Sequence, residues 1–220
     1  MKHFTKIIFN FKFKRFSLVI LLLFIYTIIC AFSYVNAVST NIQDSVFRLH
    51  VVANSDSSED QNLKYAVRDK VLEYINSISE NTSSKDEVIA LVQENIDEIR
   101  KIAQETIYEK GYDYSIRLSI GNFAFPTKTY GDISFPSGFY DALKIEIGKA
   151  KGQNWWCVMF PPLCFVDVTS GIVPEESKDT IKENLSQEEY DLLSKNNEAI
   201  NFKFKIVETF QNISIKLAQS

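Results

Sequence analysis

The chain has 220 residues, is 45% hydrophobic and contains few Gly and Pro residues, which excludes a mostly disordered or low-complexity protein. The first fifteen residues carry five basic residues and no acidic one; the rest carry 19 basic (24 minus 5) and 28 acidic residues, a net charge of −9. This acidic balance argues against nucleic acid as a partner, because binding phosphates requires positive charge.

Residues 1–37 predict a signal peptide or an N-terminal membrane anchor. An uncharged apolar run, Phe16–Phe32, follows the basic residues, and its 17 residues lie at the lower limit for crossing a bilayer. Val35-Asn36-Ala37 fits a cleavage site, so a cleaved and a retained segment both remain open. The basic flank stays in the cytoplasm in either case. A polar spacer, 38–45, and a globular domain, 46–220, are therefore expected outside it.

The first half of this domain predicts one strand followed by two helices. Residues 46–53, VFRLHVVA, are rich in β-branched residues and predict the strand. A capping-box spacing predicts that a helix begins at Ser58, and its apolar stripe ends near Ile78. A second helix begins at Ser84 and ends before Gly111. The short polar loop between the two helices predicts an antiparallel helical hairpin.

The second half predicts further strands, with one helix among them. The expected elements are strands at 112–121 and 123–131 with a hairpin turn at Gly121-Asn122, a helix from Ser137 through Tyr140, Leu143 and Ile147 to Gly148, a strand at 155–160, partly helical residues at 175–199, and a last strand at 202–210. This order predicts an α+β or mixed α/β fold, in which an antiparallel or mixed sheet packs against the helical hairpin.

The stretch NWWCVMFPPLC, Asn154–Cys164, holds both tryptophans and two of the three cysteines. As a strand it is apolar on both faces, which favours a central strand covered on both sides; a strand with one face left for a partner is the alternative. Pro161-Pro162 can turn the chain so that Cys164 returns near Cys157. Outside the cytoplasm a disulfide is permitted, but two buried thiols explain these residues almost as well.

Few residues can carry catalysis or bind a metal. His50 is the only histidine of the exported part, and one His with two Cys does not supply the ligands of a zinc site. We therefore predict no catalytic, cofactor-binding or metal site, and we interpret His50, Cys157 and Cys164 as structural. Asn54, Ser55 and Asp56 are expected to form the turn after the first strand, with side chains that accept hydrogen bonds from backbone N–H groups. A hydrolase that pairs Cys157 with His50 is the enzymatic alternative.

Residues 125–140, FPTKTYGDISFPSGFY, combine five aromatic residues with turn-forming Pro and Gly residues. Regular strands or helices cannot bury all of these rings, and protein-binding surfaces are enriched in aromatic residues. We predict a loop-rich docking face that contains Lys128, Tyr130 and Tyr140 and is flanked by the loop before Trp155. The alternative is a loop whose aromatic rings only cover the core.

Two long segments carry a family resemblance: FRLHVVANSDSSEDQNLKYAVRDKVL, and FPTKTYGDISFPSGFYDALKIEIGKAKGQNWWCVMFPPLCFVD. They resemble the stage II sporulation protein R family of endospore-forming Firmicutes, closely over about 46–75 and 114–168. The departures lie at 79–86 and in the lysine-bearing GKAKGQ.

The resemblance implies a signal protein, which is made in the forespore and exported to the space between the two membranes. There it would activate a membrane-embedded aspartic protease on the mother-cell side, and the protease would process the sigma E precursor. The resemblance implies no catalytic residue. A membrane-tethered, envelope-binding domain is a further possibility.

Overall fold

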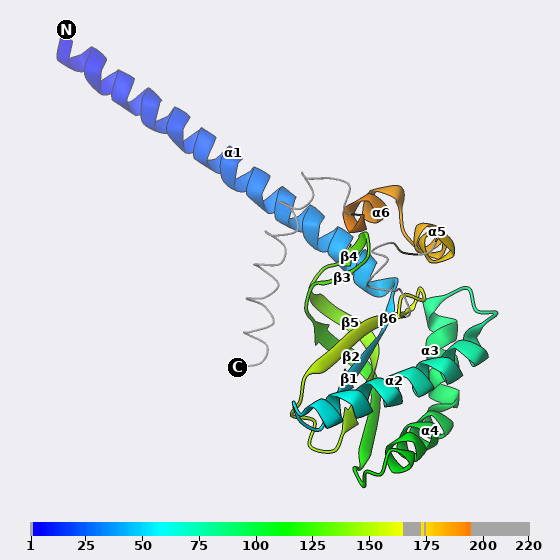
Figure 1. Ribbon diagram of the computed structural model, residues 1–220. Coiled ribbons are helices and arrows are strands. Elements are labelled where there is room, and N and C mark those ends of the chain that lie inside the picture. The colour runs from blue at the N-terminus through cyan, green and yellow to red at the C-terminus, as the bar shows by residue number, and fades with distance from the viewer. Residues whose placement is uncertain (1, 165–172, 174, 195–220) are drawn as a thin grey trace. The chain divides into compact units, whose positions relative to one another are not determined.

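The structure, a computed structural model, describes residues 2–164, 173 and 175–194 (Figure 1). Its elements are α1 (Lys2–Asp44), β1 (Phe47–Val52), α2 (Ser58–Ser79), α3 (Lys85–Glu94), α4 (Ile96–Glu109), β2 (Ile116–Phe125), β3 (Lys128–Tyr130), β4 (Ile133–Phe135), β5 (Gly138–Ile147), β6 (Asn154–Phe160), α5 (Glu175–Asn184) and α6 (Gln187–Leu193). The fold is α+β, as predicted. α5 and α6 confirm helices within 175–199, whereas the strand predicted at 202–210 lies outside the described residues.

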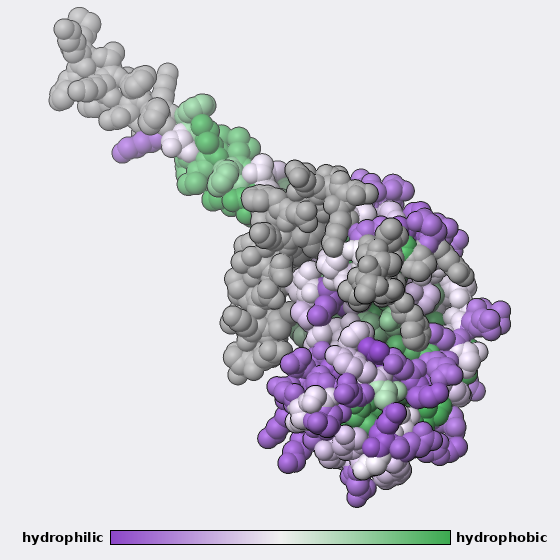
Figure 2. Space-filling view, viewed as in Figure 1, coloured by the Kyte–Doolittle hydropathy of each residue, from purple (hydrophilic) through white to green (hydrophobic). Residues whose placement is uncertain are grey.

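The N-terminal helix α1 contains the apolar segment that was predicted as a signal peptide or membrane anchor. Its window Lys14–Ala31 has a mean hydropathy of 2.0 and no buried residue. Figure 2 shows apolar residues gathered along this part of the helix. By length and composition the segment can cross a membrane or serve as a signal sequence. The chain divides into two compact units between Thr40 and Asn41, and the stretch expected as a spacer is helical up to Asp44.

The second unit is built on a four-stranded sheet with the order β2-β5-β1-β6. β1 is parallel to β5, and the other two pairs are antiparallel, so the sheet is mixed. Alternate residues of each strand point to opposite faces. The helices α2, α3 and α4 cover one face (Figure 1). We call it the helix face; its buried strand residues include Leu49, Val51, Leu143, Ile145, Ile147, Cys157 and Met159.

The opposite face carries polar and aromatic residues from the same strands. We call it the hairpin face, because the β3–β4 hairpin covers the end of it that contains Arg48. It includes Arg48 and His50 of β1, Tyr140, Ala142, Lys144 and Glu146 of β5, Trp156 and Val158 of β6, and Arg117, Ser119, Gly121, Phe123 and Phe125 of β2. Arg48 and His50 are buried, with 0% and 7% of their surface exposed. Buried polar side chains therefore lie on one face of the sheet and the main apolar core on the other.

The two helices predicted in the first half of the domain begin within one residue of the predicted positions. α2 is capped by Ser57 and not by Ser58, since the Ser57 hydroxyl accepts a hydrogen bond from the Asp60 N–H at 3.2 Å. α3 is capped by Ser84 as predicted, and its hydroxyl accepts from the Glu87 N–H at 3.3 Å. Each cap satisfies a backbone donor that the first helical turn leaves unpaired.

The single helix predicted from Ser84 to Gly111 is two helices, α3 and α4, which meet at Asn95. The Asn95 side-chain amide donates to the Leu91 carbonyl at 2.9 Å, and its oxygen accepts from the Tyr74 hydroxyl at 3.0 Å. Asn competes for helix hydrogen bonds in this way, which favours a break. The apolar residues of both helices pack against the sheet, so the predicted helical layer forms in spite of the break.

Two local predictions in the second half are wrong. The segment from Ser137 to Gly148 is the strand β5 and not a helix; it pairs with β2 on one side and with β1 on the other. Gly121-Asn122 is not a hairpin turn, because β2 continues through it while pairing with Ala142 and Asp141. The spacing of the apolar residues in β5 is compatible with a helix and with a strand. The segment forms a strand because it pairs with a neighbouring strand on each side.

The position of β6 also differs from the prediction of a central strand. Among the described strands, β6 pairs only with β1 and forms an edge of the sheet. Trp155, Cys157 and Met159 face the helices, whereas Trp156 and Val158 lie on the hairpin face. Both faces of the strand are covered in part, but its outer edge borders a pocket.

Candidate functional site

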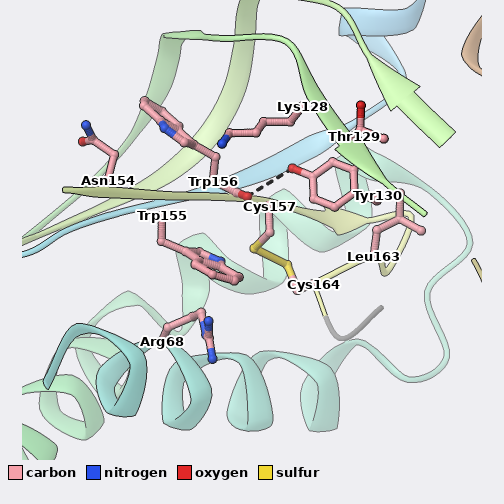
Figure 3. Close-up of a pocket in the computed structure, with 10 residues that line it drawn as sticks. All are labelled: Arg68, Lys128, Thr129, Tyr130, Asn154, Trp155, Trp156, Cys157, Leu163 and Cys164. Atoms are coloured by element: carbon pink, nitrogen blue, oxygen red, sulfur yellow. Dashed lines mark hydrogen bonds between the residues drawn. A yellow bond between two sulfur atoms is a disulfide. The ribbon is translucent and has the colours of Figure 1, made fainter. Parts of the chain in front are cut away.

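A pocket of about 400 Å³ lies along the outer edge of β6 (Figure 3). Three predicted docking residues, Lys128, Tyr130 and Trp155, line it. The full lining is Arg68 from α2; Lys128, Thr129 and Tyr130 from β3; Asn154, Trp155, Trp156 and Cys157 from β6; and Leu163 and Cys164 from the loop that follows. The fold thus joins a helix, a hairpin and an edge strand that lie far apart in the sequence.

On the helix face, the pocket wall is the indole ring of Trp155. The Arg68 guanidinium lies 4.1 Å from the centre of this ring, and the Tyr65 ring meets it edge-on at 5.6 Å. Arg68 also donates from Nε to Asp69 Oδ1 at 2.7 Å. Such cation–π and edge-to-face contacts favour one orientation of the indole. α2 therefore holds the Trp155 wall in place.

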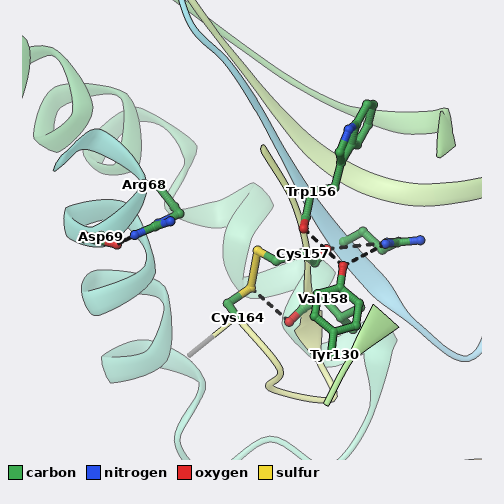
Figure 4. Close-up of a disulfide and its surroundings, with 8 residues drawn as sticks. Arg68, Asp69, Tyr130, Trp156, Cys157, Val158 and Cys164 are labelled. Atoms are coloured by element: carbon green, nitrogen blue, oxygen red, sulfur yellow. Dashed lines mark hydrogen bonds and ion pairs between the residues drawn. A yellow bond between two sulfur atoms is a disulfide. The ribbon is translucent and has the colours of Figure 1, made fainter. Parts of the chain in front are cut away.

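On the hairpin face, the pocket wall is Tyr130. Its hydroxyl donates to the Trp156 carbonyl at 3.1 Å (Figure 4). The same hydroxyl accepts from Arg48 Nη2 at 3.0 Å. Burial raises the pKa of Tyr130, and the nearby Arg48 opposes that shift only in part. The hydroxyl consequently stays protonated near neutral pH, as its bond to the carbonyl requires. This bond ties the hairpin to the edge of β6.

Arg48 supports Tyr130 from inside the fold. Its guanidinium lies 4.2 Å from the centre of the Phe125 ring and 4.6 Å from that of Tyr140. Within the described part of the chain it forms no ion pair with a carboxylate, and Nη1 has no hydrogen-bond partner. Aromatic faces attract a cation, so these rings offset part of the cost of burying it. Arg48 is a positioning residue for the pocket wall and does not line the pocket.

Tyr140 does not belong to a docking surface, and that part of the prediction is wrong. It is fully buried on β5, and its hydroxyl donates to the Pro136 carbonyl at 2.6 Å. Burial raises the pKa of this phenol above its usual range. The other aromatic residue of this strand end, Phe139, is 41% exposed. The strand alternation, which the helical reading of this segment missed, turns Tyr140 inward.

Cys157 and Cys164 form a disulfide at the base of the pocket, with their Cα atoms 5.2 Å apart (Figure 4). Of the two alternatives that the sequence left open, the structure contains the bonded one. The loop between the cysteines also donates from the Leu163 N–H to the Val158 carbonyl at 3.0 Å. These links fold the chain after β6 back onto the strand and close one end of the pocket.

His50 lies on the opposite face of the sheet from Cys157, because it is paired with Trp156 in the register. Its ring stacks on the Trp156 ring at 3.7 Å, and Nε2 lies 2.7 Å from Asn154 Oδ1. Burial lowers the pKa of His50 to about 4. The disulfide also leaves Cys157 without a thiol, so the cysteine–histidine pair is not assembled. No cluster of metal-ligating side chains occurs among the residues that the structure describes.

The turn after β1 connects this region to the helices. Asn54 Oδ1 accepts from the Lys149 N–H at 2.9 Å, and the Ser55 hydroxyl accepts from the Ser57 N–H at 3.2 Å. Asn54 also donates to Asp60 at 2.8 Å. These bonds confirm the predicted roles of Asn54 and Ser55 as acceptors of backbone donors. They bring the loop before β6 against the start of α2.

Sequence reasoning missed Arg68 and Arg48. The signal for Arg48 was present, because Arg48 and His50 alternate with Leu49 and Val51 in one strand. Such alternation marks two faces of different chemistry. Arg68 gave no comparable signal, since an arginine on a helix is usually solvated and only the contact with Trp155 places it in the pocket.

Comparison with known proteins points to one family. Residues 43–170 match the family described as stage II sporulation protein R. The chain is similar to Stage II sporulation protein R of Bacillus subtilis (strain 168), with 41% identity over 138 residues, which is 63% of this chain and 62% of that protein. The match thus spans less than two thirds of the relative. No solved structure matches the chain. The matched range contains the sheet, the helices α2 to α4 and all residues that line the pocket.

Proposed function

This chain belongs to the stage II sporulation protein R family, and from that membership we propose that it is a secreted signal between the two cells of a sporangium. In this proposal it activates the membrane-embedded aspartic protease that processes the mother-cell sigma E precursor. The observation that carries the proposal is the 41% identity to the Bacillus subtilis protein over 138 residues. The protein acts by binding and not by catalysis.

Two structural features support export from the forespore to the intermembrane space. The basic N-terminal flank and the apolar window Lys14–Ala31 have the order of a signal sequence or membrane anchor. The Cys157–Cys164 disulfide suits an oxidising compartment outside the cytoplasm. The membrane is therefore a partner at least during translocation, whether or not the segment is cleaved.

The pocket along β6 is the surface at which we place the contact with the protease. Lys128, Tyr130 and Trp155 converge on it from two elements. Trp, Tyr and Arg side chains in desolvated hollows carry most of the energy of protein binding, and Trp155, Tyr130 and Arg68 line this pocket. The alternative, an extracytoplasmic hydrolase using Cys157 and His50, requires residues that lie on opposite faces of the sheet. An envelope-binding domain would use the pocket for a different partner.

The decisive experiment reconstitutes the full chain with the protease and the sigma E precursor in vesicles, and measures precursor cleavage. We expect cleavage to depend on the dose of the chain. A His50→Gln variant should support normal precursor cleavage by the protease per folded molecule. A folded but wholly inactive His50→Gln protein would favour the hydrolase. Absence of cleavage with a folded, inserted chain would refute the signalling role.

Export has a separate test. An alkaline phosphatase fusion after residue 45 should be active, because the enzyme folds only outside the cytoplasm. The matched control places the fusion after Arg15, before the apolar run, and should be inactive. An inactive fusion after residue 45 would remove export from the proposal.

A further inference from the structure

The outer edge of β6 offers backbone groups to a partner. In an antiparallel pair, the N–H and C=O of one residue point to the same edge, and alternate residues point outward. The Trp156 carbonyl points into the pocket, where Tyr130 donates to it, and the Val158 carbonyl accepts from the Leu163 N–H on the same side. The Trp156 N–H consequently points outward as well. A carbonyl oxygen accepts two hydrogen bonds, so Tyr130 does not exclude another donor.

The charge of the pocket is opposite to that of the domain. The residues lining it include two cations, Arg68 and Lys128, and no carboxylate. Asp69 neutralises Arg68 in part from a half-exposed position. The Lys128 side chain forms no hydrogen bond or ion pair with any residue in the described ranges, whereas its backbone belongs to the β3–β4 pair. Outside the basic N-terminal flank, the chain carries a net charge of −9. A cationic pocket on an acidic protein selects an anionic ligand.

The two cations lie on opposite sides of the strand edge. Figure 3 shows Lys128 above β6 together with Tyr130, and Arg68 below it together with Trp155. The Trp155 indole, Leu163 and the disulfide provide apolar surface between them. An extended peptide places successive side chains on opposite sides of its backbone. A strand beside β6 can therefore direct a carboxylate at Lys128 and an apolar side chain at Trp155.

We propose that this pocket binds an extended acidic segment of a partner protein, which adds as a further strand to the outer edge of β6. Main-chain hydrogen bonds provide part of the affinity, and Lys128, Arg68 and Trp155 select the side chains. The inference rests on the proposed function only for the identity of the partner: the segment then belongs to the part of the protease outside the mother-cell cytoplasm. The chemistry of the pocket stands independently of that assignment.

The direct test uses the full chain in detergent micelles and fluorescein-labelled octapeptides with alternating Glu and Val. The matched peptides replace Glu by Gln, or carry N-methyl groups on the amides of one edge. Fluorescence polarisation should show binding of the Glu peptide at least tenfold tighter than that of the Gln peptide. N-methylation on the pairing edge should also cost at least tenfold, because it removes the donors to β6. Equal binding of the N-methylated peptide would overturn strand addition.

The Lys128→Glu variant tests whether the peptide binds in this pocket. It should weaken binding of the Glu peptide at least tenfold, with an unchanged melting temperature. The matched control is Lys110→Glu, the same charge reversal at an exposed position outside the pocket lining. It should change the affinity less than twofold. An equal loss in both variants would reveal only unspecific charge attraction and overturn the assignment of the site, as would an unchanged affinity in Lys128→Glu.

The precursor-cleavage assay separates this inference from the proposed function. Inhibition of cleavage by excess Glu peptide, but not by the N-methylated one, supports both. If no peptide binds while cleavage still depends on the chain, the inference fails and the signalling role stands. If the peptide binds in the pocket while cleavage does not depend on the chain, the signalling role fails and the peptide site stands.

Discussion

The two faces of the sheet come from the same four strands and differ in what they contribute. The helix face presents residues such as Leu143 and Ile145, which are fully buried under three helices. The hairpin face presents Arg48, His50 and Lys144 at neighbouring positions of the same strands. Burial of apolar surface favours folding, whereas burial of polar groups costs free energy unless they are paired. The comparison indicates that one face supplies stability and the other positions the pocket.

The largest effect is expected from Ile145→Ala on the helix face. Truncation leaves a cavity in the core and should lower the free energy of unfolding by about 3–4 kcal/mol. Lys144→Ala, one residue away on the hairpin face, should cost less than about 1 kcal/mol, because the Lys144–Glu146 pair at 3.1 Å is partly exposed. Urea unfolding of the full chain in detergent, followed by tryptophan fluorescence, measures both. Equal losses would contradict the difference between the faces.

Removal of the disulfide should have the next largest effect. The bond between Cys157 and Cys164 closes an eight-residue loop, for which chain entropy predicts a loss of about 2.5 kcal/mol. The double variant Cys157→Ala/Cys164→Ala avoids burying a polar group and should unfold at lower urea. Cys30→Ala is the control, since Cys30 is a free cysteine in α1, and should not change the transition. A stability equal to wild type would show that backbone contacts alone hold the loop.

His50 should make stability depend on pH in a narrow window. Burial lowers its pKa from 6.5 to about 4, while Lys144 and Glu146 beside it act in opposite directions. Above pH 6.5 the ring is neutral in both folded and unfolded chains. Between pH 6.5 and about 4 only the unfolded chain takes up the proton, so stability falls as the pH falls. Linkage gives a loss of ~2 kcal/mol between pH 7 and pH 5.

The variant His50→Gln cannot titrate and isolates this contribution. Its unfolding free energy should fall by less than that of the wild type between pH 7 and pH 5, when both are measured by urea unfolding. Parallel pH profiles for the two proteins would show that His50 is protonated in the folded state and contradict the burial argument.

The smallest effect is expected from Arg48→Met, in spite of complete burial. Met fills a similar volume among the rings, and the substitution removes a charge whose Nη1 has no partner among the described residues. Replacement of a buried charge by a hydrophobic residue is often neutral, so we expect a change below about 1 kcal/mol. Arg48→Ala, which leaves a cavity, should cost more. A large loss in Arg48→Met would show that the bond to Tyr130 is essential for the hairpin face.

Helical segments and caps could be predicted from the sequence because their signals are local. The apolar stripes of α2 and α4 repeat at helical spacing, and Ser84 precedes its helix as a cap should. The misread element is β5, whose Tyr140, Leu143 and Ile147 fit helical spacing as well. Whether this segment forms a helix or a strand depends on its pairing with β1, which lies far earlier in the chain. The local sequence pattern cannot predict that pairing.

The pocket was predictable only in part. An aromatic-rich segment indicated Lys128 and Tyr130, and the neighbouring loop indicated Trp155. Their convergence depends on β6 being an edge strand and on Arg68 from α2 reaching Trp155, which are features of the tertiary arrangement. Tyr140 was assigned to the same surface because regular elements were not expected to bury all five aromatic rings of 125–140, whereas the alternation of β5 buries this ring.

The bond from Tyr130 to the Trp156 carbonyl has a consequence for solubility. The segment NWWCVMF is apolar, uncharged and strand-forming, and an open edge of this composition is a template for aggregation between copies of the chain. The loop closed by the disulfide covers the Val158 end of that edge, Tyr130 takes one of the two acceptor positions of the Trp156 carbonyl, and Lys128 places a charge beside them. A newly made chain whose cysteines are still reduced lacks part of this protection. In the reduced chain, closure of this loop therefore competes with self-association.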